Sequence, residues 1–180
     1  MDDRLAKWMG ELRRFNPRLH LVGPSMLEHL EEEVEVTSRL LEGITEPAIA
    51  DLGSGSGLMA FVYKALHPDS IVTCVERSVK KCDFLRHTAE VLGLEGFCVL
   101  CEDLLASGRR FKAAMARSFS PVATLGKICS RVLVEGGRLY YLSSSNPQEM
   151  GSGFRLDGIQ TARSGTGLTL NLWRFTRLRP

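Results

Sequence analysis

The sequence predicts an α/β fold in which a mostly parallel sheet is covered by helices on both faces. Short apolar runs that suit buried strands alternate with helical segments from Pro47 onward. A glycine-rich loop joins the first of these strands to the helix that follows it. Two extended segments near the C-terminus, joined by a Ser-Gly-Thr-Gly turn, indicate an antiparallel hairpin.

The chain length favours one domain. With 180 residues, 44% of them hydrophobic, the chain can bury one substantial core but is short for two full domains. We therefore expect a single domain over residues 1–180, in which an N-terminal helical extension over 1–45 precedes a core over 46–180.

The extension is predicted to contain helices over residues 3–14 and 25–42. Apolar residues recur at helical spacing in the second of them, and Ser25 can cap it. Pro17 and the pair Gly23–Pro24 are expected to break the chain between the two helices.

Strands and helices alternate through the core. The predicted strands cover 48–50, 71–75, 97–100, 113–115 and 139–142, and the predicted helices cover 57–66, 78–92 and 121–134. The terminal hairpin would pair 154–160 with 168–175. Right-handed crossovers between parallel strands would place helices on both faces of the sheet.

Membrane and export signals are not expected. The longest uninterrupted apolar run, Leu58 to Tyr63, has six residues, where a membrane helix needs about 20. The first four residues do not resemble a secretory leader. We therefore expect a cytoplasmic protein without a membrane partner. We also expect it to be a monomer.

The cysteines are expected to be reduced, buried thiols. Their number is odd and their spacing fits no disulfide framework; they are Cys74, Cys82, Cys98, Cys101 and Cys129. Cys98-x-x-Cys101 lacks a second Cys or His pair, and residues three apart on a strand point to opposite faces. The sequence therefore predicts no metal site.

The charge is unevenly distributed. Residues 1–106 carry 11 Lys and Arg against 18 Asp and Glu, whereas residues 107–180 carry 12 against 3. A basic half can bind an anionic partner, and a solvated basic surface is the alternative. The residues that could contact phosphates are Lys80, Lys81, Arg109, Arg110, Arg174, Arg177 and Arg179.

The loop "ADLGSGSGL", residues 50–58, is the most informative stretch. Glycine lets the backbone approach a ligand closely, and the following helix offers free N–H groups. A dinucleotide fingerprint would need glycine at the position of Leu58, whereas D-x-G-x-G-x-G is the spacing of class I S-adenosylmethionine enzymes. The spacing therefore favours S-adenosylmethionine over a nicotinamide cofactor, and a methyltransferase over an oxidoreductase.

Acidic residues at the ends of the next two strands support this interpretation. Glu76 closes the second strand, where a carboxylate can accept both ribose hydroxyl protons. Glu102 and Asp103 follow the third strand, where an acid can meet the adenine amino group, although Asp103 can equally cap a short helix. The complete set of expected cofactor-binding residues is Asp51, Gly53, Ser54, Gly55, Gly57, Leu58, Glu76, Arg77, Glu102, Asp103 and Arg117.

Residues 10–145 resemble the RsmG (GidB, glucose-inhibited division protein B) family, bacterial methyltransferases that act on the N7 atom of a guanine in 16S rRNA. Four stretches carry the resemblance: "RFNPRLHLVG", the glycine loop, "VERSVKKCDFLRHTAEVLGL" and "FKAAMARSFSP". It implies a class I S-adenosylmethionine-dependent methyltransferase (Rossmann-like) fold, that cofactor, and 16S rRNA or the small ribosomal subunit as the partner.

The last of these stretches also implies a catalytic role. In the family it lies beside the cofactor at the carboxyl end of the sheet, so Arg117 is the candidate for contact with the RNA or the target base. A surface arginine after a strand is the alternative. No general base is expected, because a guanine ring nitrogen attacks through its own lone pair and the four histidines are scattered along the chain.

The chain also departs from the family pattern. The family's second helix usually carries an Arg-His pair followed by an Asp-Ser pair, whereas the corresponding positions here are His29, Leu30 and Glu33, in an acidic stretch. Lys112 opens the fourth strand where an aspartate is usual, and Ser143 is at the position where a lysine usually closes the fifth. A cofactor-binding but catalytically silent ribosome-associated factor, and a methyltransferase with a small-molecule acceptor, are therefore alternatives.

Overall fold

A computed structural model describes residues 2–106, 108–117, 122–144 and 150–179. Its helices are α1 (Asp3–Leu19), α2 (Pro24–Glu28), α3 (Leu30–Leu41), α4 (Leu58–Leu66), α5 (Val79–Val91) and α6 (Val122–Val132). Its strands are β1 (Ala48–Leu52), β2 (Ile71–Glu76), β3 (Phe97–Cys101), β4 (Phe111–Arg117), β5 (Leu133–Ser143), β6 (Phe154–Arg163) and β7 (Thr169–Arg177).

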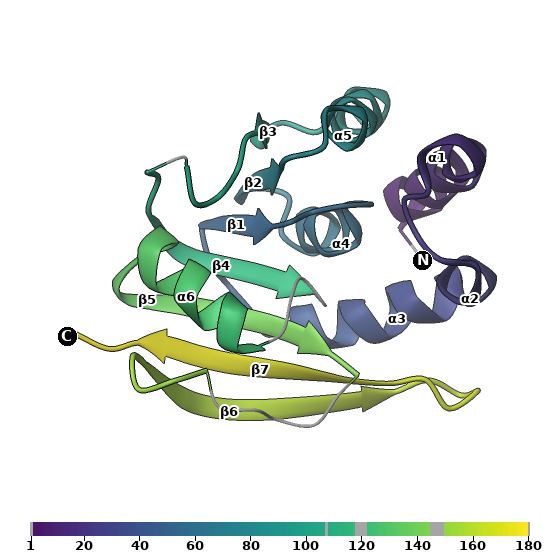
Figure 1. The fold of residues 1–180 in the computed structure, drawn as a ribbon. Helices are drawn as coiled ribbons and strands as arrows, with labels where there is room; N and C mark the ends of the chain where they lie inside the picture. The colour runs from purple at the N-terminus through teal and green to yellow at the C-terminus, as the bar shows by residue number, and fades with distance from the viewer. Residues whose placement is uncertain (1, 107, 118–121, 145–149, 180) are drawn as a thin grey trace.

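The strands form a single seven-stranded sheet in the order β3-β2-β1-β4-β5-β7-β6 (Figure 1). The first five strands of that order pair in parallel, and β7 is antiparallel to both β5 and β6. The order of the strands changes sense at β1. From β1 the chain first adds β2 and β3 on one side of this strand, and it then crosses over to add β4 and β5 on the other side. The predicted mostly parallel sheet with a terminal hairpin is confirmed.

Along the strands, successive side chains belong alternately to two hydrophobic clusters, one on each face of the sheet. On β4, Ala113 and Met115 join a cluster with the helices α1, α3, α4 and α5, whereas Ala114 and Ala116 join a cluster with α6. This period of two is what a pleated strand buried on both faces requires. Helices therefore cover both faces, as the sequence predicts.

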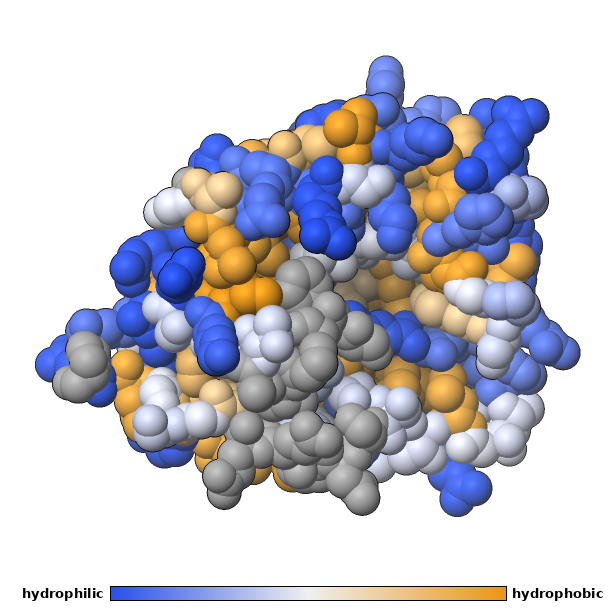
Figure 2. Space-filling model, in the orientation of Figure 1, coloured by the Kyte–Doolittle hydropathy of each residue, from blue (hydrophilic) through white to orange (hydrophobic). Residues whose placement is uncertain are grey.

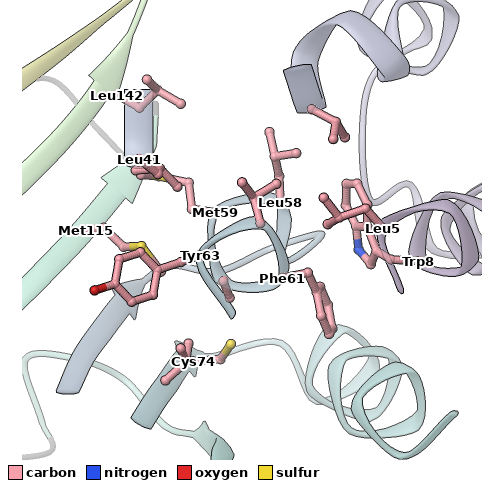
Figure 3. Close-up of a cluster of buried hydrophobic side chains, with 14 of the residues drawn as sticks. Leu5, Trp8, Leu41, Leu58, Met59, Phe61, Tyr63, Cys74, Met115 and Leu142 are labelled. Atoms are coloured by element: carbon pink, nitrogen blue, oxygen red, sulfur yellow. The ribbon is translucent and has the colours of Figure 1, made fainter. Parts of the chain in front are cut away.

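Helix α4 is the central element of the larger cluster (Figure 3). Every residue from Leu58 to Lys64 is buried, so this helix is enclosed on all sides rather than amphipathic. Figure 3 shows Trp8 and Leu5 of α1 on one side of α4 and Met115 of β4 on the other. Because α4 is packed on all sides, the position of its first residue, Leu58, is fixed. The glycine loop ends directly before this residue.

The N-terminal extension differs from its sequence-based prediction in two places. Helix α1 runs through Pro17 to Leu19 and ends at His20, which adopts a left-handed conformation with φ 48°. Pro17 cannot donate a main-chain hydrogen bond, and the helix ends two residues later, at Leu19. The expected helix over 25–42 is divided at His29 into α2 and α3.

Strand β5 and the cysteines give two further corrections. The pair Gly136–Gly137 lies within β5, which begins at Leu133, and the pairing with β4 shifts its register there. Cys98 and Cys101 are exposed rather than buried, because β3 is an edge strand and has a neighbour on one side only. All five cysteines are free thiols.

The described residues offer neither a candidate membrane-spanning helix nor a candidate metal site. None of their helices combines the length and the apolar character that crossing a membrane requires. The same part of the chain contains no group of three or more His, Cys, Asp and Glu side chains that could hold a metal ion.

Candidate functional site

The loop between β1 and α4 depends on three left-handed glycines. Gly53, Gly55 and Gly57 have φ values of 71°, 55° and 79°, a region that other residues enter only with strain. A Cβ on Gly57 would lie 2.6 Å from Cδ2 of Leu85 and from Cε2 of Phe61, so that position also needs glycine for packing. A Cβ on Gly55 would meet nothing closer than the Gly53 carbonyl oxygen at 3.8 Å.

Glu76 joins this loop to the next strand and helix. Its Oε2 accepts a hydrogen bond from Gly55 N–H at 3.0 Å, and its Oε1 accepts one from Ser78 N–H at 2.9 Å. Gly53 N–H donates to the Val75 carbonyl oxygen at 2.8 Å. The carboxylate is therefore held by backbone N–H groups on both sides, and the loop is tied to the carboxyl end of β2.

Asp51 is a buried acid below the loop. Its Oδ2 has no hydrogen-bond partner among the described residues. Burial raises the pKa of Asp51 to about 7; hydrogen bonds from Ser54 and from the Ala60 backbone oppose that rise, and the Glu76 carboxylate adds to it. An acceptor atom without a partner, buried at the base of the loop, favours a ligand that carries positive charge or hydrogen-bond donors.

These residues line one pocket with a volume of about 700 Å³. The predicted residues that line it are Asp51, Gly53, Ser54, Gly55, Leu58, Glu76, Arg77, Glu102, Asp103 and Arg117. Gly57 does not line it and instead packs against α4 and α5. In the view of Figure 2 the surface is hollowed at the end of the sheet toward which β1 and β4 point. The pocket is of the size that small-molecule cofactors occupy in proteins.

On the β3 side of the pocket, both acids have other partners. Glu102 accepts a hydrogen bond from Arg109 Nε at 2.7 Å. Asp103 Oδ1 accepts one from Leu105 N–H at 2.7 Å, so one of its oxygens caps the turn that follows the strand. Both functions considered for Asp103 thus remain compatible with its position.

On the β4 side of the pocket, Arg117 forms an ion pair with the N-terminal extension. Its Nη2 donates to Glu33 Oε2 of α3 at 2.6 Å, and the two side chains are 20% and 9% exposed. Arg117 Nη1 is buried and has no partner among the described residues. Arg117 is therefore not a free surface arginine: it lines the pocket and is tethered on one side.

The sequence did not predict that the N-terminal extension lines the pocket. Leu21, Val22 and Met26 form part of its wall. Asn16 shapes this segment, because its carbonyl oxygen accepts a hydrogen bond from His20 N–H and its side-chain Oδ1 accepts one from Val22 N–H at 2.9 Å. The stretch "RFNPRLHLVG", which contains Leu21 and Val22, is the sequence feature that could have indicated this contribution to the pocket. The other lining residues not predicted are Ser56, Met59, Val75, Lys81, Leu104, Leu105 and Ile128.

The four acids of α3 all have partners within the protein. Each acid from Glu31 to Glu33 has a different partner: Arg13 of α1 for Glu31, Ser164 and Thr166 of the hairpin turn for Glu32, and Arg117 for Glu33. Glu35 pairs with Arg39 on the same helix. These acids stabilise contacts between elements.

Several arginines of the basic half also have partners inside the molecule. Arg174 donates to Gln160 Oε1 and Arg177 to the Leu133 carbonyl oxygen. Arg179 lies 3.8 Å from Glu135, with its side chain 88% exposed.

Comparison with known proteins identifies the family. A family model described as rRNA small subunit methyltransferase G (GidB) matches residues 1–152. The ribosomal RNA small subunit methyltransferase G of Paracoccus denitrificans is 30% identical over 98% of this chain and 95% of its own length. The corresponding protein of Rubrobacter xylanophilus is 35% identical over 56% of this chain and 41% of its own length.

Solved structures agree on the fold. A mutant of MtNAS in complex with S-adenosylmethionine is 15% identical, with a TM-score of 0.68 over 97% of this chain and 73% of that one. TrmN from Thermus thermophilus is 20% identical, with a TM-score of 0.58 over 81% of this chain and 48% of that one. The predicted fold class and family are therefore confirmed: the chain belongs to the rRNA small subunit methyltransferase G family, whose cofactor is S-adenosylmethionine.

Proposed function

We propose that the protein transfers a methyl group from S-adenosylmethionine to N7 of a guanine in 16S rRNA, acting as a cytoplasmic monomer on the small ribosomal subunit or its RNA. The observation that carries this proposal is the pocket of a family member in which the left-handed loop, Glu76 and Asp51 converge. Membership of the family supports methylation of small-subunit rRNA as the reaction. Guanine N7 as the target atom is proposed in addition.

The pocket residues fit the cofactor. The unpartnered Oδ2 of Asp51 and the bare backbone at Gly55 suit the amino acid part, which carries an ammonium group and lies close to the main chain. The Glu76 carboxylate is held rigidly by two backbone N–H groups and can accept hydrogen bonds from the ribose hydroxyls. Glu102 or Asp103 would then meet the adenine amino group.

When bound, the cofactor supplies an electrophilic methyl group on a sulfonium. None of the described residues that line the pocket is a histidine, and a guanine N7 attacks without first losing a proton, so the chain needs no general base there. The protein's task is to align the two reactants and exclude water, an effect worth as much as about 7–11 kcal/mol. Leu21, Val22 and Met26 provide an apolar wall for this purpose.

The test is transfer of a radiolabelled methyl group to naked 16S rRNA and to assembled small subunits, followed by mapping of the modified nucleotide. One new 7-methylguanine is expected. Cofactor binding without incorporation into either substrate would contradict the proposal in favour of a silent ribosome-associated factor. Incorporation into a small molecule alone would identify a different acceptor.

A further inference from the structure

An ion pair connects the pocket to the acidic helix α3. Glu33 and Arg117 are 84 residues apart in the sequence and meet at 2.6 Å, with the Glu33 side chain only 9% exposed. The neighbouring acids Glu31 and Glu32 bind Arg13 and the hairpin turn instead, so their partners do not line the pocket. Glu33 is therefore the acid of this stretch whose contact reaches the pocket wall.

The ion pair satisfies only one of the two terminal nitrogens of the Arg117 guanidinium. Glu33 takes Arg117 Nη2, while Nη1 is withdrawn from water and has no acceptor among the described residues. A buried charged donor without a partner is unfavourable, and such groups are rare in folded proteins. An acceptor oxygen brought by a ligand would satisfy it.

The position of Arg117 limits what that ligand can be. Glu76 ends β2, and Glu102 and Asp103 follow β3, on one side of β1, whereas Arg117 ends β4 on the other side. Arg117 is the only basic residue among the described lining residues on that side, since Arg77 and Lys81 follow β2. Arg117 therefore lies on the β4 side of the pocket, away from the acids expected at the adenine end.

We infer that Glu33 is a positioning residue: it holds the Arg117 guanidinium at the pocket wall so that this group binds an acceptor oxygen of a ligand. The oxygen can come from the cofactor carboxylate or from the target base, because both present the same chemistry to an arginine. Glu33 has a second effect on this side of the pocket. It offsets the charge of Arg117, so that the positive charge a purine gains on N-methylation forms beside a neutral pair.

This inference rests on the proposed function only for the base oxygen. Its first test is calorimetry with S-adenosylmethionine and with 5′-methylthioadenosine, which lacks the amino acid part. If the cofactor carboxylate is the acceptor, Glu33→Ala and Arg117→Gln each weaken S-adenosylmethionine binding about 10- to 100-fold and leave 5′-methylthioadenosine binding unchanged. The variant with both substitutions is then no weaker than either single variant, because one interaction has been removed.

If the base oxygen is the acceptor, cofactor affinity is unchanged. Affinity for small subunits with S-adenosylhomocysteine bound, or the KM for RNA, then changes by a similar factor. Glu33→Gln keeps an acceptor for Arg117 and should restore part of the lost affinity, which a purely structural role would not require. Glu32→Ala, which changes the next acid of α3 and its contact with the hairpin, is the matched control and should alter neither affinity.

Two results would overturn the inference. One is wild-type affinity of Glu33→Ala for both the cofactor and the small subunit, in protein whose unfolding transition shows that it is folded. The other is equal weakening of S-adenosylmethionine and 5′-methylthioadenosine binding, which would show a general collapse of the pocket. A wild-type protein that binds the cofactor but methylates no rRNA would contradict the proposed function, and the calorimetric comparison would still decide the role of Glu33.

Discussion

Trp8 Nε1, in the first helix, donates a buried hydrogen bond of 3.1 Å to the carbonyl oxygen of Ser56, in the glycine loop. The two residues are 48 positions apart, and the Trp8 side chain has no solvent exposure. The centroid of the indole ring also lies 6.1 Å from the centroid of the Phe61 ring on α4. The N-terminal extension therefore fixes the loop that forms the centre of the pocket.

We expect Trp8→Phe to weaken cofactor binding. The substitution leaves a buried carbonyl oxygen without its donor, which costs about 1–3 kcal/mol and frees the loop to leave its binding conformation. Calorimetry with S-adenosylmethionine measures the effect. Trp173→Phe is the control, because Trp173 is equally buried and its Nε1 has no partner among the described residues. Equal cofactor affinities for the two variants would refute the role given to Trp8.

Gly55→Val should abolish cofactor binding and leave the fold largely intact. The residue has φ 55°, which costs a β-branched side chain at least about 1–2 kcal/mol, and its side chain would point into free space rather than into the core. Gly93→Val tests the same backbone strain away from the pocket, since Gly93 has φ 59° and open space around it. Both variants should lose similar stability in urea, and retained cofactor binding by Gly55→Val would show the loop assignment to be wrong.

Asp51 should make the protein less stable as the pH rises. The carboxyl titrates near 3.8 in the unfolded chain, whereas burial raises its pKa to about 7 in the folded protein. Between these values the folded state keeps a proton that the unfolded state releases, so raising the pH destabilises the fold by at most about 4 kcal/mol. Asp51→Asn removes this contribution.

The measurement is urea denaturation of wild type and Asp51→Asn at pH 5 and pH 8. The variant should gain stability relative to wild type at the higher pH, even though it loses an acid that lines the pocket. Such a gain is expected where an unfavourable group is kept for function. Asp83→Asn, at an exposed acid on α5, is the control for the loss of a carboxylate. An unchanged difference between Asp51→Asn and wild type at both pH values would contradict the prediction.

Glu46 should matter for stability but not for binding. It lies before β1, at the end of the sheet opposite the pocket, where its carboxylate accepts hydrogen bonds from the Tyr140 hydroxyl at 2.6 Å and from Arg138 Nη2 at 2.7 Å. Burial alone would raise the pKa of Glu46, but the hydrogen bonds from Arg138 and Tyr140 outweigh it and lower the pKa. Glu46→Ala is expected to cost about 2 kcal/mol, mostly from the buried tyrosine contact, because Arg138 is half exposed.

Because the folded pKa of Glu46 is lowered, its contribution is present above the unfolded value of 4.5 and is lost as the pH falls below it. Urea denaturation at pH 7 and pH 3 measures this change. Glu90→Ala, at an exposed position of α5, is the control. A loss of cofactor affinity in Glu46→Ala would show that the two ends of the sheet are coupled, contrary to expectation.

The glycine loop and its left-handed conformation could be predicted from the sequence because their requirements are local. Gly53, Gly55 and Gly57 occupy left-handed positions that few other residues tolerate, and Glu76 closes a strand whose apolar run is visible in the sequence. Element boundaries were less predictable. Pro17 remains within a helix and Gly136–Gly137 within a strand, because the packing of neighbouring elements outweighs their local preference.

What the sequence determined by itself is therefore the alternation of strands and helices, the glycine loop and the acids that follow the strands, since each depends on residues close together in the chain. Only the tertiary structure decided that Trp8 holds the loop, that Glu33 holds Arg117, and that Cys98 and Cys101 lie at an exposed edge. These contacts join residues that are distant in sequence, and nothing local to either partner specifies the other. The free energy of burying and pairing them depends on how the elements pack.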